Sequence, residues 1–331
     1  MTQIALGAAV GEATLGRKVG SRAILWGAVC GTLPDFDVFV PLGDAVRDFT
    51  YHRSATHSLL VLAAFSPLMV WLILKVHPQT TPYRRRWLLL VYLVFATHVL
   101  LDSFTVYGTQ LFWPVDNTPV AWSTIFIIDP TYTLPLLIGV IAALAINRTR
   151  SIGHRLNWLG IALSTCYLAW TVGAKWHVEQ VARESLARQG IAYEHLLTVP
   201  APFNSLLWRV LVTRPNGYAD GFYSLLDKNR HIALRSFPSS RRLLAGIEHH
   251  WPVRRLQWFT KGFYSVNLIG RNVVITDLRM GLEESYVFRF KIGELGNPHA
   301  TATIPERLPP QRDFTRLKNV WARIWDQDVE I

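Results

Sequence analysis

The run SLLVLAAFSPLMVWLILKV, residues 58–76, decides the class of fold because it is almost unbroken apolar sequence. A helix needs about 20 mostly apolar residues to cross roughly 30 Å of hydrocarbon. Three further stretches approach that length: Trp87 to Leu101, Thr131 to Ile146 and Trp158 to Ala174. We therefore predict a membrane all-α bundle with about four transmembrane helices.

The composition agrees with a membrane protein. Half of the 331 residues are hydrophobic, only 17% are charged, and the mean hydropathy is +0.20. The net charge of +11 is read as a topology signal, since Lys and Arg mark the loops of membrane proteins. The lipid bilayer is thus the expected partner, and no nucleic acid is expected. Cys30 and Cys166 lie in apolar runs, which argues against disulfides and thiolate zinc sites.

The N-terminal 34 residues predict a helical hairpin. Two apolar segments, Ile4 to Leu15 and Ala23 to Leu33, flank a polar turn, and each is too short to span a membrane. Glycines lie at positions 7, 11, 16, 20, 27 and 31, with intervals of four or five residues within each apolar segment and its flanks. Such spacing favours close contact between helices.

The basic residues of the short loops predict the orientation. Loops rich in Lys and Arg face the cytoplasm. Two loops qualify, one with Arg84, Arg85 and Arg86 and one with Arg148, Arg150 and Arg155. The long connection over residues 103–130 contains no Lys or Arg, so we expect it to face outward. By parity, everything after Lys175 is also expected to be extracytoplasmic.

The remainder of the chain changes character. We predict a transmembrane domain over 1–176, a linker helix over 177–199, and a small β-rich extracytoplasmic domain over 200–331. Alternating and β-branched segments are the candidate strands. They are Trp208 to Val212, His231 to Phe237, Leu256 to Phe259, Tyr264 to Ile269, Asn272 to Thr276 and Tyr286 to Ile292.

Ionisable groups gather in short motifs that the predicted topology brings to one membrane face. The motifs are GTLPDFD over 31–37, HRSATHS over 52–58, HVLLD over 98–102 and DPTY over 129–132. In HVLLD the i, i+4 spacing places an imidazole and a carboxylate on one helix face. Polar groups beside hydrocarbon are costly and tend to be functional, and clustered carboxylates repel unless a cation neutralises them.

A divalent metal site follows from these residue types. The predicted ligands are Asp35, Asp37, His57, His98 and Asp102. Imidazole and carboxylate ligands suit Zn²⁺ first, with Mn²⁺ or Fe²⁺ as alternatives. A site with an open position can acidify a bound water for hydrolysis. Asp37, as a general base, and His52 are the candidate catalytic residues.

Several of the candidate site residues also have a purely structural interpretation. His98 alone could be a histidine bonded to a neighbouring helix, and Asp35 and Asp129 could be helix caps. Arg53 is either a fork for phosphate or an interfacial anchor, with the anchor favoured. Glu12 is either a carboxylate that supports the metal site or a buried hydrogen-bonding group.

At these motifs the chain resembles the YdjM family of bacterial inner-membrane metal-dependent hydrolases. The resemblance covers roughly the first 150 residues, through LGAAVGEATLGRKVG, GTLPDFD, HRSATHS, HVLLDSFTVYG and IIDPTYTLP. It implies an inner-membrane hydrolase with ligands drawn from the five residues above, and a distant likeness to zinc phospholipases and single-strand nucleases. Many members begin with a Thr-His pair where this chain has Thr2-Gln3. Either the metal shell is smaller here, or Gln3 only hydrogen-bonds to it.

The resulting hypothesis is a membrane-embedded, metal-dependent hydrolase of an ester, namely a phosphoester of a lipid or lipid-linked substrate. A site at the boundary of lipid and water is reached most easily by amphiphiles. One alternative is a non-enzymatic ion-binding scaffold or transporter with a closed site. Another is a regulatory protein whose β-rich domain binds a partner.

Overall fold

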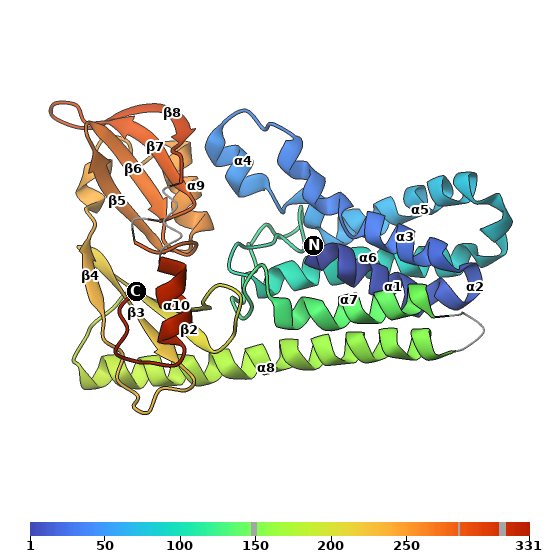
Figure 1. Cartoon of the computed structure of the whole chain (residues 1–331). Helices are drawn as coiled ribbons and strands as arrows, with labels where there is room; N and C mark the ends of the chain where they lie inside the picture. Colours follow the sequence, from blue (N-terminus) through green and yellow to red (C-terminus); the bar gives the residue numbers. More distant parts are fainter. Residues whose placement is uncertain (147–150, 284, 311–315) are drawn as a thin grey trace. The chain divides into compact units, whose positions relative to one another are not determined.

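The computed structural model describes residues 1–146, 151–283, 285–310 and 316–331 (Figure 1). Arg148 and Arg150, on which the orientation argument partly rests, lie outside these residues. The chain forms two compact units. The helical unit comprises residues 1–40 and 52–171, and the β unit comprises residues 41–51 and 172–331.

The helical unit is built on the expected N-terminal hairpin and on longer apolar helices. Its helices are α1 (Thr2–Gly11), α2 (Arg17–Val19), α3 (Ser21–Cys30), α5 (Leu59–Val76), α6 (Arg84–Phe104), α7 (Pro130–Ala145) and the first part of α8 (Ile152–Arg188). A π-helical turn over Glu12–Gly16 joins α1 to α2. Short 3-10 helices cover Leu33–Phe39, Ala55–His57 and Pro78–Tyr83.

Glycines hold α1 and α3 in backbone contact, as their spacing predicts. A Cβ atom added to Gly7 would lie 2.2 Å from the carbonyl oxygen of Gly27, and one added to Gly27 would lie 2.2 Å from the oxygen of Gly7. No side chain fits at either position, so only glycine permits this crossing. The hairpin leads directly into the 3-10 helix that carries Asp35 and Asp37.

Two segments of the described chain are long and apolar enough to cross a membrane. They are α5, with 18 residues, and Pro78–Phe104, with 27 residues. Large apolar side chains on α5 such as Leu68 and Trp71 are half exposed, as expected for a surface that faces lipid. Two of the four predicted spans therefore meet this criterion of length and hydropathy, and the other two do not.

The other two predicted spans differ for identifiable reasons. Helix α7 is apolar but only 16 residues long, which is shorter than a typical span. Helix α8 runs unbroken for 37 residues, through the predicted fourth span and most of the predicted linker helix. The apolar part of α8 is diluted by buried polar residues such as Asn157 and Ser164.

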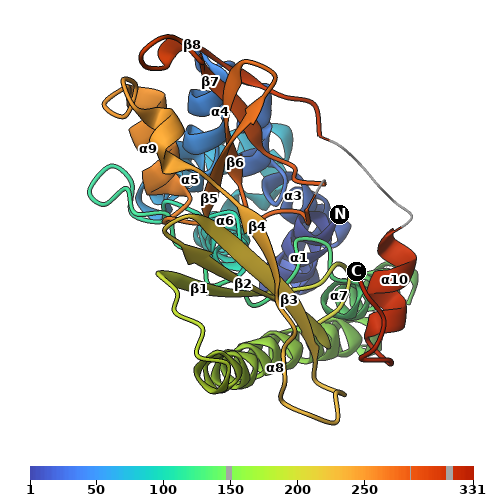
Figure 2. The same cartoon turned by 90° about the vertical axis from the view of Figure 1, so that its left-hand side faces the viewer.

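The β unit contains two four-stranded antiparallel sheets (Figure 2). The first has the order β1 (His195–Pro200), β2 (Leu207–Arg214), β3 (Gly217–Ser224), β4 (Arg235–Pro238). The second has the order β5 (Tyr264–Ile269), β6 (Asn272–Asp277), β7 (Arg289–Glu294), β8 (Thr301–Arg307). The C-terminal part of α8 covers the first sheet through Val178 and Val181, which pack with Trp208 and Val210.

One predicted strand is wrong, and two are shifted. Leu256 to Phe259 is the end of helix α9 (Trp251–Phe259), where Val253, Leu256 and Phe259 form a buried face with helical spacing. The strand predicted to start at His231 begins only at Arg235, and the strand predicted to start at Tyr286 begins at Arg289. The short C-terminal helix α10 (Arg316–Arg323) was not predicted.

A short segment between two of the motifs with predicted metal ligands belongs to the β unit. Residues 41–51, which include α4 (Ala45–Tyr51), belong to the β unit although they lie between Asp37 and His52 in sequence. Phe49 anchors this segment, with its ring centroid 4.9 Å from that of Phe259 and 5.1 Å from that of Phe290. The boundary between the units therefore differs from the single linker expected over 177–199.

Candidate metal centre

Four side chains from three separate segments bring their donor atoms to one point in the helical unit. Asp35 lies on the 3-10 helix after α3, His57 ends the 3-10 turn before α5, and His98 and Asp102 lie one turn apart on α6. One ligand atom from each of these residues lies within 4.8 Å of the others. His57, His98 and Asp102 are buried, whereas the side chain of Asp35 is 43% exposed. The cluster thus has one open side.

The distances within the cluster are nearly uniform. The Nε2 atom of His57 lies 3.3 Å from Oδ1 of Asp35, 3.2 Å from Oδ2 of Asp102 and 3.4 Å from Nε2 of His98. The Nε2 atom of His98 lies 3.5 Å from Oδ1 of Asp35 and 3.3 Å from Oδ2 of Asp102. Four potential donor atoms therefore surround one small space.

The other nitrogen of each ring fixes the tautomer. Nδ1 of His98 lies 2.8 Å from the carbonyl oxygen of Gly31, which can only accept, so this Nδ1 donates. The Thr56 hydroxyl donates to Asp37 at 2.6 Å and therefore accepts from Nδ1 of His57 at 3.0 Å. In neutral rings both Nε2 atoms then carry lone pairs. With both rings neutral, two imidazole lone pairs and two carboxylates converge on this space.

A divalent cation fits this donor set. Zinc bonds of about 2.0–2.1 Å in a tetrahedron place neighbouring donors roughly 3.3–3.4 Å apart, which is close to five of the six separations among these four donors, while all of them lie within 4.8 Å of one another. Oδ2 of Asp102 is buried and receives no hydrogen bond from any described residue. Asp35, His57, His98 and Asp102 would hold the ion.

Asp37 and His52 form a pair beside this cluster. Nδ1 of His52 lies 2.7 Å from Oδ1 of Asp37, and Oδ2 of Asp37 accepts from the backbone N–H of Arg53 at 3.2 Å and from Thr56. Burial raises the pKa of Asp37, but the hydrogen bonds from His52 and Thr56 outweigh it and leave the pKa lowered. Asp37 lies 3.8 Å from Nδ1 of His57, on the opposite side of that ring from the four donor atoms. At that distance Asp37 makes no direct hydrogen bond to His57, so it orients this ring only through the Thr56 hydroxyl.

Arg53 reaches the cluster from a strained backbone. Its φ angle is 63°, and its carbonyl oxygen accepts from the backbone N–H of Gln110 at 2.9 Å. The buried guanidinium lies 3.3 Å from Oδ1 of Asp102, donates to Thr105 at 3.1 Å and stacks over the ring of Tyr107 at 5.1 Å. Its Nε has no hydrogen-bond partner among the described residues. The left-handed backbone is what turns this side chain toward Asp102.

A pocket of about 470 Å³ opens beside the cluster. Asp35, Asp102, Arg53 and Gln3 form its polar part, and Leu101 and residues 125–128 form its apolar part. Gln3 donates from Nε2 to Oδ1 of Asp102 at 3.0 Å, which supports the interpretation that Gln3 only hydrogen-bonds to a ligand. The pocket can therefore accept a molecule with one polar and one apolar end.

The comparison with known families agrees with this arrangement. Residues 1–178 match the profile of the family described as YdjM inner membrane protein, and this match covers more than half of the chain. The chain belongs to the YdjM family. Together with the apolar helices, membership assigns it to the inner membrane.

A relative of this family member occurs in Bacillus subtilis (strain 168), where it carries the name "Uncharacterized protein YfhP". The two chains are 30% identical over 152 residues, which cover 44% of this chain and 45% of the relative. The match thus spans less than half of the curated relative. No solved structure matches this YdjM chain.

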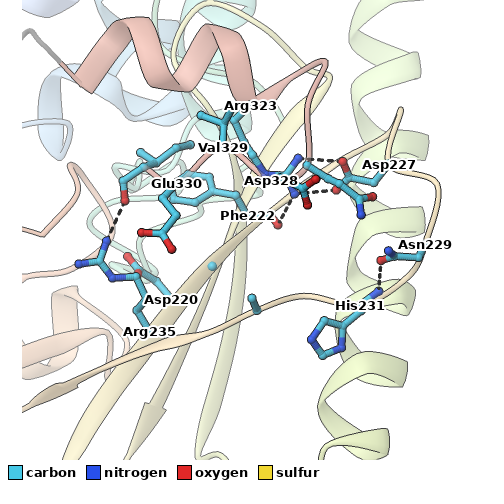
Figure 3. Close-up of a pocket in the computed structure, with 14 residues that line it drawn as sticks. Asp220, Phe222, Asp227, Asn229, His231, Arg235, Arg323, Asp328, Val329 and Glu330 are labelled. Atoms are coloured by element: carbon cyan, nitrogen blue, oxygen red, sulfur yellow. Dashed lines mark hydrogen bonds and ion pairs between the residues drawn. The ribbon is translucent and has the colours of Figure 1, made fainter.

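A second pocket, of about 300 Å³, lies in the β unit of this family member (Figure 3). Several of its charged side chains are held by contacts within the β unit. Arg323 pairs with Asp227 at 2.7 Å, and Arg235 donates to the backbone oxygen of Ile331 at 3.0 Å. Asp220, also on its wall, pairs with the buried Arg209 at 2.7 Å. These contacts hold parts of the pocket wall in place within the β unit.

The sequence did not identify Thr56, and it singled out Arg53 without its contact to Asp102. Thr56 holds both Asp37 and His57, yet a threonine in HRSATHS carries no signal of such a role. The interaction of Arg53 with Asp102 depends on its positive φ, which no local pattern indicated. Asp129 does cap α7, accepting from the N–H groups of Thr131 and Tyr132, so its structural interpretation is confirmed.

Proposed function

We propose that this YdjM family member is a membrane-embedded, metal-dependent hydrolase of an ester, namely a phosphoester of a lipid or lipid-linked molecule. The observation that carries the proposal is the convergence of two Nε2 lone pairs and two carboxylates at near-tetrahedral separations. The exposed side of Asp35 and the adjoining pocket favour an open, catalytic site over a closed structural one.

A divalent ion held by the four residues would supply an acidified water and a positive charge beside the ester. Zn²⁺ suits the donor set best, with Mn²⁺ or Fe²⁺ as alternatives. Arg53 lines the pocket next to Asp102 and is assigned to bind an anionic oxygen of the substrate. Leu101 and the apolar segment 125–128 would contact its hydrocarbon part.

His52 is assigned as the group that takes up or returns a proton. Its Nδ1 is held by Asp37, which leaves Nε2 for proton transfer. Asp37 itself is occupied by His52, Arg53 and Thr56, so we assign it to orient His52 and His57. The sequence led us to expect Asp37 as both a metal ligand and the general base. We assign it an orienting role instead because both of its carboxylate oxygens are already engaged.

We also propose a multi-pass arrangement in which α7 and α8 join α5 and α6 in the bilayer. An exposed apolar stripe on α7 supports it, formed by Leu134, Ile138, Ile141 and Leu144. Leu159, Leu163 and Trp170 form a similar exposed surface on α8. In this arrangement the metal centre and the β unit are extracytoplasmic. A C-terminal alkaline phosphatase fusion is expected to be active, and an inactive one would contradict the orientation.

Metal analysis tests the enzymatic proposal. The protein purified in detergent is expected to contain about one divalent ion per chain by inductively coupled plasma mass spectrometry, and to cleave bis(p-nitrophenyl) phosphate or a short-chain phospholipid. Asp102→Ala should lose both properties. Asp35→Asn gives a second test at a partly exposed position, where folding tolerates the change better.

Asp116→Asn is the matched control, since this carboxylate is exposed and lies outside the cluster. A metal-free native protein, or equal metal content in all variants, would refute the metal centre. Bound metal without cleavage of either substrate would favour the ion-binding scaffold.

A further inference from the structure

The helical unit contains another polar pocket, which lies far from the metal centre. It has a volume of about 440 Å³ and is lined by Thr14, Leu15, Arg17, Lys18, Arg86 and His154, among others. Figure 1 shows α2 and the start of α8 at the same end of this unit. Arg86 precedes Asp102 by 16 positions on α6, which is about 24 Å at 1.5 Å per residue. The two pockets are therefore independent sites.

The walls of this pocket are held by specific contacts. Glu12, in the π-helical turn, places Oε1 3.4 Å from Nδ1 of His154, and Nε2 of His154 accepts from Trp158 at 3.2 Å. A Cβ atom on Gly16 would meet the Glu12 carboxylate, so with any other residue there this carboxylate would have to move away from its present position. Single π-helical turns of this kind are frequent at functional sites. The ring of His154 is thus fixed between α8 and the turn.

Among the described residues, the three cations of the pocket have no ion-pair partner. Arg17, Lys18 and Arg86 form no ion pair with any residue that the structure describes. The acidic residues of the helical unit are Glu12, Asp35, Asp37, Asp102, Asp116 and Asp129. Of these, only Glu12 contacts the pocket wall, through His154. A net positive pocket remains, which favours an anionic ligand.

We propose that this pocket binds a phosphate group, carried by an anionic phospholipid or present as a soluble phosphate. Arg side chains bind phosphate oxygens through paired N–H donors, and Lys adds a point charge. Basic pockets between membrane helices bind acidic lipid headgroups in this way. The neighbouring exposed Leu88, Leu89 and Trp158 provide the apolar surface that a lipid chain requires. This site does not depend on the hydrolase proposal.

Native mass spectrometry of the full chain in detergent tests the proposal. The probes are dioleoyl phosphatidylglycerol and, as a zwitterionic comparison, dioleoyl phosphatidylcholine. Inorganic phosphate, titrated by calorimetry, tests the soluble source. Binding of one phosphatidylglycerol at least tenfold tighter than phosphatidylcholine identifies a lipid headgroup, whereas stoichiometric binding of inorganic phosphate alone identifies the soluble ligand. Binding of neither probe overturns the proposal.

A pair of triple variants separates the pocket from general surface charge. Arg17→Gln with Lys18→Gln and Arg86→Gln should weaken binding at least tenfold. The control is Arg22→Gln with Arg84→Gln and Arg85→Gln, which removes the same charge from exposed positions that do not line the pocket. It should change binding less than twofold, and equal losses in both triples would overturn the proposal. Arg86→Gln alone, on the exposed start of α6, is expected to weaken binding about threefold even if the pocket triple fails to fold.

Discussion

The Nε2 atoms of His57 and His98 lie 3.4 Å apart, although the Nδ1 atom of each ring already makes a hydrogen bond. Both rings are buried, so water cannot separate the two nitrogens at low cost. A cation between them, held also by Asp35 and Asp102, would relieve this arrangement. The hydrogen bonds behind the rings are therefore as important to the centre as the four donor atoms.

Thr56→Val tests the support behind His57. The change keeps the shape of the side chain but removes the hydroxyl that joins Asp37 to His57. We expect metal affinity to fall about 10- to 100-fold, as for other residues that orient ligands. Competition with a chelator for Zn²⁺ measures this affinity. Thr118→Val, at an exposed threonine outside the cluster, serves as the control, and equal affinity in both variants would argue against the role of Thr56.

Arg53→Lys tests recognition of an anionic substrate. Lysine keeps the charge but loses the planar fork and its contacts to Thr105 and Tyr107. We expect kcat/KM for the phosphodiester to fall about 10- to 100-fold, equivalent to roughly 1.4–2.7 kcal/mol, with metal content retained. Arg47→Lys, a half-exposed arginine of the β unit, should leave kcat/KM unchanged. An unaltered rate in Arg53→Lys would support the role of an interfacial anchor.

Gly27→Ala tests the crossing of α1 and α3. The added methyl group would lie 2.2 Å from the carbonyl oxygen of Gly7, so the helices must separate. We expect a loss of about 1–3 kcal/mol in stability, measured as a lower Tm in detergent. Gly173→Ala on α8 is a sharp control because no atom lies within 4 Å of its new Cβ. That variant should be neutral or more stable, and similar Tm values for the two would contradict the close crossing.

From the buried ammonium group of Lys175 we expect the free energy of unfolding to rise with pH. Burial lowers the pKa of its ammonium group to about 8, while the nitrogen donates to the carbonyl oxygen and hydroxyl of Thr198. Because the unfolded state binds this proton more tightly, stability should increase between about pH 8 and 10, by roughly 1 kcal/mol per pH unit. Thermal unfolding of the native protein and of Lys175→Met across this range measures the effect. A slope that persists in Lys175→Met would assign it to other groups.

Much of the helical unit follows from local sequence. The apolar runs of α5 and α6 and the glycine spacing of α1 and α3 express properties of single helices and of one contact between neighbours. The separation of His98 and Asp102 by four residues likewise places both on one face of α6. These features depend on periodicity, which a sequence displays directly.

The tertiary structure decided the features that do not follow from the periodicity of the sequence. Which nitrogen of His57 faces the donor cluster depends on Thr56 and Asp37, and the direction of Arg53 depends on a left-handed backbone. The burial of Phe49 against Phe259 and Phe290 assigned residues 41–51 to the β unit, although they lie between two metal motifs in sequence. Contacts between distant segments set these outcomes, because hydrogen-bond direction and side-chain packing depend on the partner rather than on the residue itself.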